Sequence, residues 1–225
     1  MDIIYELMLI IPILLISLSI HEFSHGYVSY LLGDPTPKAM GRLTLNPLAH
    51  LDPMGSLVLI LTRRFGWAKP VPINPNYYNS PKKGMIYVGI AGPASNFVLA
   101  VIFSLFARGV IFLSSSSMYQ LQQSGYGSIF FTAFVFFRLA VIINISLGLF
   151  NLLPVPPLDG SKILFGFLPS KFDKYLRKLE GPAGMLLLLG LAYTGILWGV
   201  LGPAVNLFYN ILKLGVNLPF DSIIV

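Results

Sequence analysis

The stretch His21-Glu22-Phe23-Ser24-His25 decides how the rest of the chain is interpreted. On an α-helix, side chains four residues apart project from one face, so His21 and His25 are expected a little more than one turn apart. This spacing suits two ligands of one zinc ion. Glu22 lies about 100° round the helix from His21, where it is suited to act as a general base on a water near the metal. The motif therefore indicates a metalloprotease.

The motif lies inside a run of largely apolar residues, from about residue 8 to residue 32. The run is too long for a signal peptide, it lacks a basic segment before it, and it contains the motif itself. We therefore expect a membrane-embedded helix of the mature protein. Ionisable side chains are costly at membrane depth, which favours a functional role for His21, Glu22 and His25.

The composition describes one integral membrane domain over residues 1–225. Of its residues 55% are hydrophobic and only 11% are charged, which is too apolar for an ordinary soluble domain. The chain has no cysteine, and this excludes a disulfide framework and a thiolate metal site. The net charge of +6 is better explained by membrane topology than by nucleic-acid binding, because aromatic and basic residues are not interleaved.

Four apolar segments are long enough to cross a bilayer, at about 20 residues per span. They cover residues 4–32, 85–113, 129–153 and 183–214. The expected fold is thus an all-α polytopic membrane protein with a three-helix catalytic core (about 4–165) and a C-terminal helical segment. The last segment is too long for one straight span, and we expect a break or kink at Gly202-Pro203. Whether it forms one span with an interfacial helix or two short spans is left open.

Basic residues are distributed unevenly between the loops. The loop at 114–128 has none, whereas the loops on either side are rich in them: Lys38, Arg42, Arg63, Arg64, Lys69, Lys82 and Lys83 in one, and Lys162, Lys171, Lys174, Arg177 and Lys178 in the other. Cytoplasmic loops carry the excess of lysine and arginine. The asymmetry therefore predicts that the two basic loops are cytoplasmic and that the N-terminus lies outside.

The first loop, from Gly33 to Lys83, is too long for a mere connection. Residues 56–61 are apolar but too short to span, and the prolines near residues 70–75 favour extended backbone. An extended or hairpin element dipping into the membrane interface would fit. Residues 63–73 could hold an unwound substrate by edge pairing, or the loop could simply cover the core.

A third metal ligand is expected, because a catalytic zinc site normally has three protein ligands and one open position. Asp159 is the best candidate, since it follows the third apolar segment on backbone made irregular by prolines. Asp34 and Asp52 lie among turn residues, where capping is the simpler role. His50, in a turn of the first loop, is expected to make a hydrogen bond rather than to bind the metal. Asn96 alone would indicate polar helix packing.

Together these motifs resemble the site-2 protease family of intramembrane zinc metalloproteases. The resemblance covers about residues 10–165. Its motifs are His21-Glu22-Phe23-Ser24-His25, Asn46-Pro47-Leu48-Ala49-His50, Gly66-Trp67-Ala68-Lys69-Pro70, Ala91-Gly92-Pro93-Ala94-Ser95-Asn96, and Asn151 to Pro154 with Pro156 and Leu158-Asp159-Gly160. The chain is similar to minimal members of the family, because it has no room for a PDZ or CBS domain.

The resemblance implies that His21, His25 and Asp159 hold one zinc ion inside the membrane, nearer the cytoplasmic face. It also implies roles for Asn96 and Asn151 in substrate positioning or oxyanion stabilisation. The substrate would be a transmembrane protein in the lipid bilayer of a prokaryotic cell, cut in regulated intramembrane proteolysis. The alternative is a zinc-binding membrane protein without hydrolysis, a transporter or a helix-binding scaffold. A transporter would need ligands across the bilayer, and only one cluster is visible.

Overall fold

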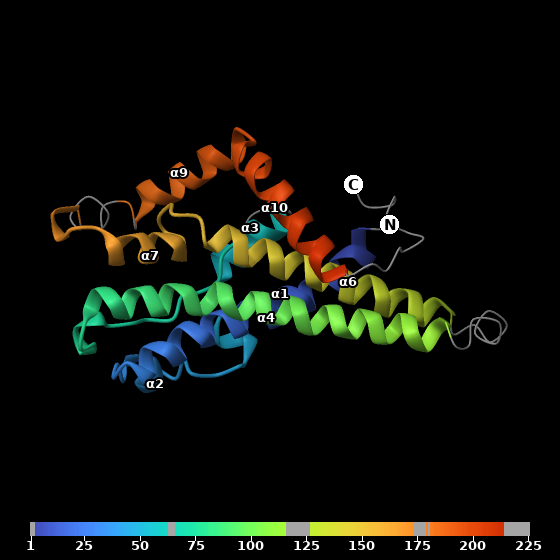
Figure 1. The fold of residues 1–225 in the computed structure, drawn as a ribbon, viewed down its shortest axis with the longest axis horizontal. Helices are drawn as coiled ribbons and strands as arrows, with labels where there is room; N and C mark the ends of the chain where they lie inside the picture. The colour runs from blue at the N-terminus through green and yellow to red at the C-terminus, as the bar shows by residue number, and fades with distance from the viewer. Residues whose placement is uncertain (1–2, 63–65, 116–126, 173–178, 180, 214–225) are drawn as a thin grey trace.

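The fold is built on three long helices, which agree with the first three apolar segments. The computed structural model describes residues 3–62, 66–115, 127–172, 179 and 181–213 (Figure 1). The long helices are α1 (Ile3–Leu31), α4 (Pro81–Ser115) and α6 (Gly127–Asn151). Each is long and apolar enough to cross a membrane. The expectation of an all-α polytopic membrane protein is therefore confirmed.

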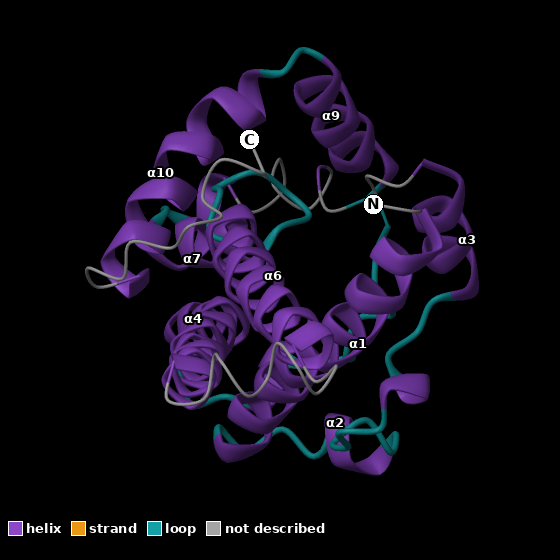
Figure 2. Ribbon diagram, turned by 90° about the vertical axis from the view of Figure 1, so that its right-hand side faces the viewer, coloured by secondary structure: helices purple, strands orange, loops and turns teal. Residues whose placement is uncertain are grey.

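The three long helices pack around a small apolar core. Figure 2 shows α1, α4 and α6 grouped together. The fully buried side chains Ile13, Ala100, Ala140 and Ile145 contribute to this core from all three helices. Large apolar side chains on the outer faces are exposed, as expected where a helix surface contacts lipid.

The C-terminal segment is broken at a different place from the one predicted. Helices α9 (Pro182–Tyr193) and α10 (Ile196–Lys213) meet at an angle of 73°, and together they have the length and composition of a broken span or a re-entrant loop. The expected break at Gly202-Pro203 is wrong, because Pro203 lies inside α10. The chain instead turns at Gly195, whose φ of +76° is the left-handed conformation in which glycine commonly ends a helix. A proline inside a membrane helix is tolerated when neighbouring groups satisfy the freed carbonyl.

Helix α10 returns to the three-helix core. Val205, Tyr209 and Leu212 pack against the core cluster. The Arg138 guanidinium, on α6, lies 5.8 Å from the centre of the Tyr209 ring. This cation–π contact provides a partner for a charge that the sequence places deep in a membrane span.

The first loop is folded from short helices rather than from a hairpin. It contains α2 (Thr36–Ala39), η1 (Pro47–Ala49), α3 (Pro53–Thr62) and η2 (Pro75–Tyr77). Asp52 caps α3, as its turn setting predicted, because its Oδ1 accepts a 2.8 Å hydrogen bond from the Gly55 N–H. The described part of the chain contains no strand, and the hairpin reduces to one antiparallel bridge between Leu51 and Ala68. Residues 63–65 of the expected edge lie outside the described residues.

Asp34 ties the first loop to the end of α1. The side chain is fully buried and accepts hydrogen bonds from Ser29 Oγ at 2.7 Å, from the Thr36 N–H at 2.9 Å and from the Asn74 N–H at 2.7 Å. Burial favours the neutral carboxyl, but the hydrogen bonds from Thr36, Asn74 and Ser29 outweigh it and lower the pKa of Asp34 below its ordinary value of 3.8. Its carboxylate therefore stabilises the loop at neutral pH.

Replacing Asp34 by asparagine is expected to lower the free energy of unfolding by about 1–3 kcal/mol at pH 7, the usual cost of leaving buried donors unsatisfied. Because the folded pKa lies below the unfolded one, the contribution of the carboxylate is present above the unfolded pKa of about 3.9 and is lost as the pH falls through the folded pKa. Unfolding in detergent mixtures at pH 7 and at pH 3 tests this. A difference between wild type and D34N that does not shrink in acid would contradict it.

Candidate metal centre

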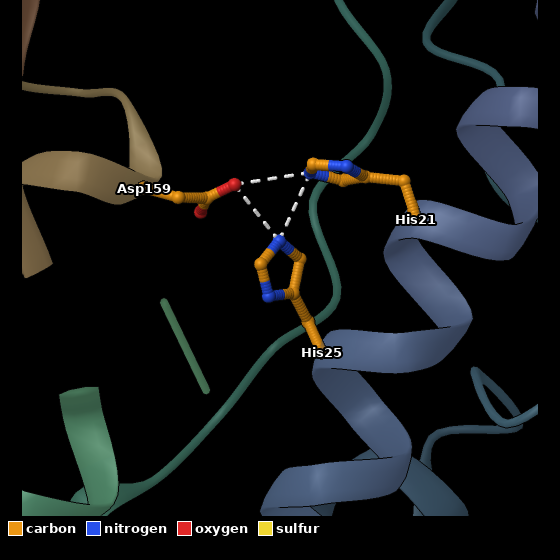
Figure 3. A group of neighbouring side chains, drawn as sticks. All are labelled: His21, His25 and Asp159. Atoms are coloured by element: carbon orange, nitrogen blue, oxygen red, sulfur yellow. Dashed lines mark hydrogen bonds and ion pairs between the residues drawn. The ribbon is translucent and has the colours of Figure 1, made fainter. Parts of the chain in front are cut away.

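Three buried side chains converge at one point between α1 and α7 (Asp159–Phe167). The Nε2 atoms of His21 and His25 are 3.0 Å apart, and each is 3.0 Å from Oδ2 of Asp159. Figure 3 shows the two imidazoles leaving successive turns of α1 toward the carboxylate at the start of α7. The three side chains are only 6–7% exposed. The structure therefore brings together the two histidines of the motif and the aspartate singled out as their partner.

Asp159 reaches α1 because the chain reverses directly after α6. The prolines at 154, 156 and 157 prevent α6 from continuing, and α7 begins at Asp159 itself. Gly160 makes the reversal tight: a Cβ there would lie 2.2 Å from the carbonyl oxygen of Leu152. On the other side, a Cβ at Gly89 of α4 would lie 3.0 Å from the carbonyl oxygen of Asp159. Two glycines thus allow the aspartate to be packed between α6 and α4.

The second polar atom of each converging side chain is also held. His21 Nδ1 lies 2.6 Å from Oδ1 of Asn96, and His25 Nδ1 lies 2.7 Å from the carbonyl oxygen of Val88. Lys162 Nζ donates to Oδ1 of Asp159 at 2.8 Å. Such outer contacts fix the orientation of metal ligands and, for histidine, the tautomer. All three side chains therefore point one defined atom at the common centre.

These contacts fit a metal ion at the centre. When each Nδ1–H donates outward, both Nε2 atoms of the neutral rings carry bare lone pairs, and Oδ2 of Asp159 adds another. Three lone pairs 3.0 Å apart repel one another unless a cation lies among them. Two imidazole nitrogens and a carboxylate oxygen are a ligand set typical of catalytic zinc, although cobalt or iron would also bind it. Among the described residues this is the one such cluster of three.

Gly92 of α4 leaves the space that the centre needs. A Cβ at this position would lie 2.3 Å from Nε2 of His25 and 2.6 Å from Nε2 of His21. Real Cβ contacts are never so short, so only glycine lets the α4 backbone pass beside the two imidazoles. Gly92 belongs to one of the motifs quoted from the sequence, but nothing in the sequence indicated that its neighbours are the two histidines.

Glu22 is held by the first loop. Its side chain is partly exposed, and its Oε2 accepts a 2.8 Å hydrogen bond from the Val71 N–H. Val71 stands between Pro70 and Pro72, which have no N–H, so its amide is the single backbone donor of residues 70–72. Arg42 holds the segment in place by donating to the carbonyl oxygen of Lys69 at 2.5 Å. The loop therefore lies against the acid of the motif.

The two asparagines of the sequence motifs are placed differently. Asn96 is fully buried next to His21, and its Nδ2 donates to Oδ1 of Asn144 at 3.0 Å. Asn151 is partly buried at the end of α6 and donates to the carbonyl oxygen of Leu147 at 2.9 Å. Within the described residues it makes no hydrogen bond to the three converging side chains. Asn144 and Lys162 were not predicted as site residues, although a polar residue in an apolar span and a lysine three residues after Asp159 were visible signals.

Comparison with known proteins places this geometry in a family context. The model of "Peptidase family M50" matches residues 9–191. The chain is 38% identical over 193 residues to the Bacillus subtilis protein named "Putative zinc metalloprotease YwhC", which covers 86% of this chain and 84% of the relative. It is 28% identical to "Putative zinc metalloprotease Rip2" of Mycolicibacterium smegmatis (87% and 67% covered) and 26% identical to "Zinc metalloprotease MJ0392" of Methanocaldococcus jannaschii (82% and 42% covered). No solved structure matches the chain.

Proposed function

Because the chain belongs to peptidase family M50 and is an intramembrane zinc metalloprotease, we propose that His21, His25 and Asp159 hold its catalytic zinc ion and that Glu22 is the general base. The observation that supports this proposal most strongly is that Nε2 of His21, Nε2 of His25 and Oδ2 of Asp159 are buried and lie 3.0 Å from one another, beside the part of α1 that also bears Glu22. No observation favours the non-hydrolytic alternative, a transporter or scaffold.

Bound by such a set, zinc supplies Lewis acidity, which polarises a peptide carbonyl and makes a water more acidic. Glu22 takes the proton of the attacking water and later gives it to the leaving amine. The Val71 N–H holds Oε2 of Glu22, so the carboxylate is oriented before substrate arrives. Lys162 orients Asp159 through an ion pair, and its positive charge partly balances the negative charges of Asp159 and Glu22. The contacts of Asn96 support a role through His21 rather than in direct contact with the oxyanion.

The substrates are membrane proteins, and we propose that they are cut in or near their transmembrane segments. A helix hides its peptide bonds in backbone hydrogen bonds, so the substrate must unwind locally before Glu22 and water can reach the carbonyl. Asn151 stands at the end of α6, just before the reversal that leads to Asp159, and is a candidate for contact with such an unwound segment.

We also propose that residues 1–225 form one domain. Helix α10 supports this, because its side chains Val205, Tyr209 and Leu212 pack on the three-helix core.

The ligand set is tested by the zinc content of purified variants. Asp159→Ala and His25→Ala are expected to lose the ion, whereas wild type holds one per chain, because two ligands bind a catalytic zinc too weakly to survive purification. The matched control is His50→Gln: His50 is equally buried, but it donates from Nε2 to the carbonyl oxygen of Thr44 at 2.8 Å and lies outside the cluster. Full zinc occupancy in both ligand variants would overturn the proposed site.

We propose further that the N-terminus lies outside a prokaryotic cell membrane and that the metal centre is nearer the cytoplasmic face. The bacterial relatives support this host. The position of His25 in α1 supports the proposed depth of the metal centre. His25 lies six residues before the end of α1 at Leu31, which is about 9 Å at 1.5 Å per residue. This end of α1 leads into the basic first loop, which is the loop expected on the cytoplasmic side.

The orientation can be read by chemical labelling, since the natural chain has no cysteine. A cysteine at the exposed Gly127, at the start of α6, is expected to react with an impermeant maleimide in intact cells. A cysteine at the exposed Lys38, in the first loop, should react only after the cells are opened. The reverse pattern would show that the basic loops lie outside.

A further inference from the structure

A chain of buried hydrogen bonds leads from His21 into the middle of the three-helix core. His21 Nδ1 is 2.6 Å from Oδ1 of Asn96, and Asn96 Nδ2 donates to Oδ1 of Asn144 at 3.0 Å. Nδ2 of Asn144 donates in turn to the carbonyl oxygen of Ala140 at 2.8 Å and to Ser17 Oγ at 2.9 Å. Asn96, Asn144 and Ser17 are completely buried. This series of hydrogen bonds connects α4 and α6 with two residues of α1, Ser17 and His21.

The donors and acceptors in this series of hydrogen bonds can be arranged in one way only, because the series ends on a carbonyl oxygen, which can only accept. The carbonyl oxygen of Ala140 requires the NH₂ side of the Asn144 amide, which turns Oδ1 of Asn144 toward Asn96. Asn96 must then present its own NH₂ to Asn144, and its Oδ1 faces His21. An acceptor beside Nδ1 holds a proton on Nδ1, so the neutral imidazole that binds a metal presents its bare Nε2. The orientation of Asn144 therefore determines which nitrogen of His21 can bind a metal.

We propose that Asn144 is a positioning residue of the metal centre, which sets the tautomer of His21 through Asn96. The proposal rests on the proposed function, in that His21 is taken as a zinc ligand. Among the described contacts, Asn144 makes no hydrogen bond to His21, His25 or Asp159. It acts by orienting the side-chain amide of Asn96, which lies 48 residues earlier in the sequence. Outer contacts of this kind typically change metal affinity by about 10- to 100-fold.

Asn144→Leu keeps the approximate volume of the side chain and removes both hydrogen-bonding groups. Without its acceptor, the Asn96 amide is no longer oriented and can turn its NH₂ toward Nδ1 of His21. That arrangement favours the tautomer with the proton on Nε2, which must be displaced before zinc binds. We expect N144L to bind zinc about 10- to 100-fold more weakly than wild type.

A second substitution should make Asn144 dispensable. Asn96→Asp places a carboxylate beside Nδ1 of His21, and either of its oxygens accepts the Nδ1–H without any orienting donor. The double variant N96D/N144L is therefore expected to recover most of the zinc affinity lost in N144L. A merely structural role of Asn144 in helix packing would not produce this rescue.

The experiment measures zinc affinity by competition with a chelator in detergent, for wild type, N144L and N96D/N144L. The matched control is Asn206→Leu, the same change at an exposed position of α10, which should bind zinc as wild type does. Imidazole ¹⁵N spectra of zinc-free wild type give a second readout, since the chain has only three histidines. We expect a proton on Nδ1 of His21 and of His25, because the oxygen beside each of these atoms accepts, and a proton on Nε2 of His50, which donates to Thr44.

The outcomes separate this inference from the assignment of the site. Wild-type affinity in N144L, a loss that persists in N96D/N144L, or an Nδ1 of His21 that carries no proton in zinc-free wild type would each overturn the inference. The last measurement needs no variant, so it decides even if N144L does not fold. Failure of the proposed function is seen elsewhere, in full zinc occupancy of the Asp159→Ala and His25→Ala proteins.

Discussion

Replacing Glu22 by glutamine is expected to leave one zinc ion bound per chain and to lower the turnover of a transmembrane substrate by about 10²- to 10⁴-fold, the usual contribution of a general base. Glutamine has nearly the same shape, and its amide oxygen can still accept the Val71 N–H, so the first loop should keep its place. It cannot take the proton from the attacking water. Metal content and cleavage of a model substrate, both in detergent, measure the two effects separately.

The same helix offers a matched control for this change. Glu6 is exposed near the opposite end of α1, and Glu6→Gln should alter neither zinc content nor cleavage. A Glu22→Gln protein that cleaves as fast as wild type would show that the activity does not belong to this site. A variant that loses both zinc and activity would show that Glu22 supports the ion rather than the proton transfer.

Gly92→Ala is expected to weaken zinc binding by about 10- to 100-fold, although it changes no ligand. The added Cβ would lie 2.3 Å from Nε2 of His25 and 2.6 Å from Nε2 of His21, the two atoms that face the centre. Helix α4 cannot simply move away, because Leu99, Ala100 and Phe103 pack in the core. One of the imidazoles must rotate instead, which removes its lone pair from the centre.

The control for this prediction lies in the same helix. A Cβ at Gly109 of α4 meets no heavy atom within 4 Å, so Gly109→Ala should bind zinc as wild type does. Chelator competition compares the two variants, and circular dichroism checks that both remain helical. Equal affinities would mean that α4 does not approach the histidines as closely as the structure has it.

The sequence predicted the features that depend on local periodicity. The three long spans follow from runs of apolar residues, and the pairing of His21 with His25 follows from their spacing of four on one helix. Asp159 could be singled out because prolines leave it on irregular backbone after a span. The structure brings these three side chains together, as the sequence analysis expected.

What the sequence did not predict depends on contacts between distant segments. No local signal links Val71 with Glu22, which are 49 residues apart, or Asn144 with Ser17, which are 127 residues apart. The break between α9 and α10 was misplaced because Gly202-Pro203 is the stronger local signal, whereas Gly195 ends the helix through its left-handed backbone. Helix α3 was missed because its apolar run is short and helix and strand cannot be distinguished at that length.

The distance along the chain between the paired histidines and Asp159 has a consequence for biosynthesis. Asp159 follows His25 by 134 residues. A ribosome that adds roughly 5–20 residues per second completes the intervening chain about 7 to 27 s after His25. Until then the nascent protein offers the metal only two of the three proposed ligands. With these ligands, the enzyme is expected to be assembled inactive in the membrane and to acquire its proteolytic activity only once its third span and the turn after it have been made.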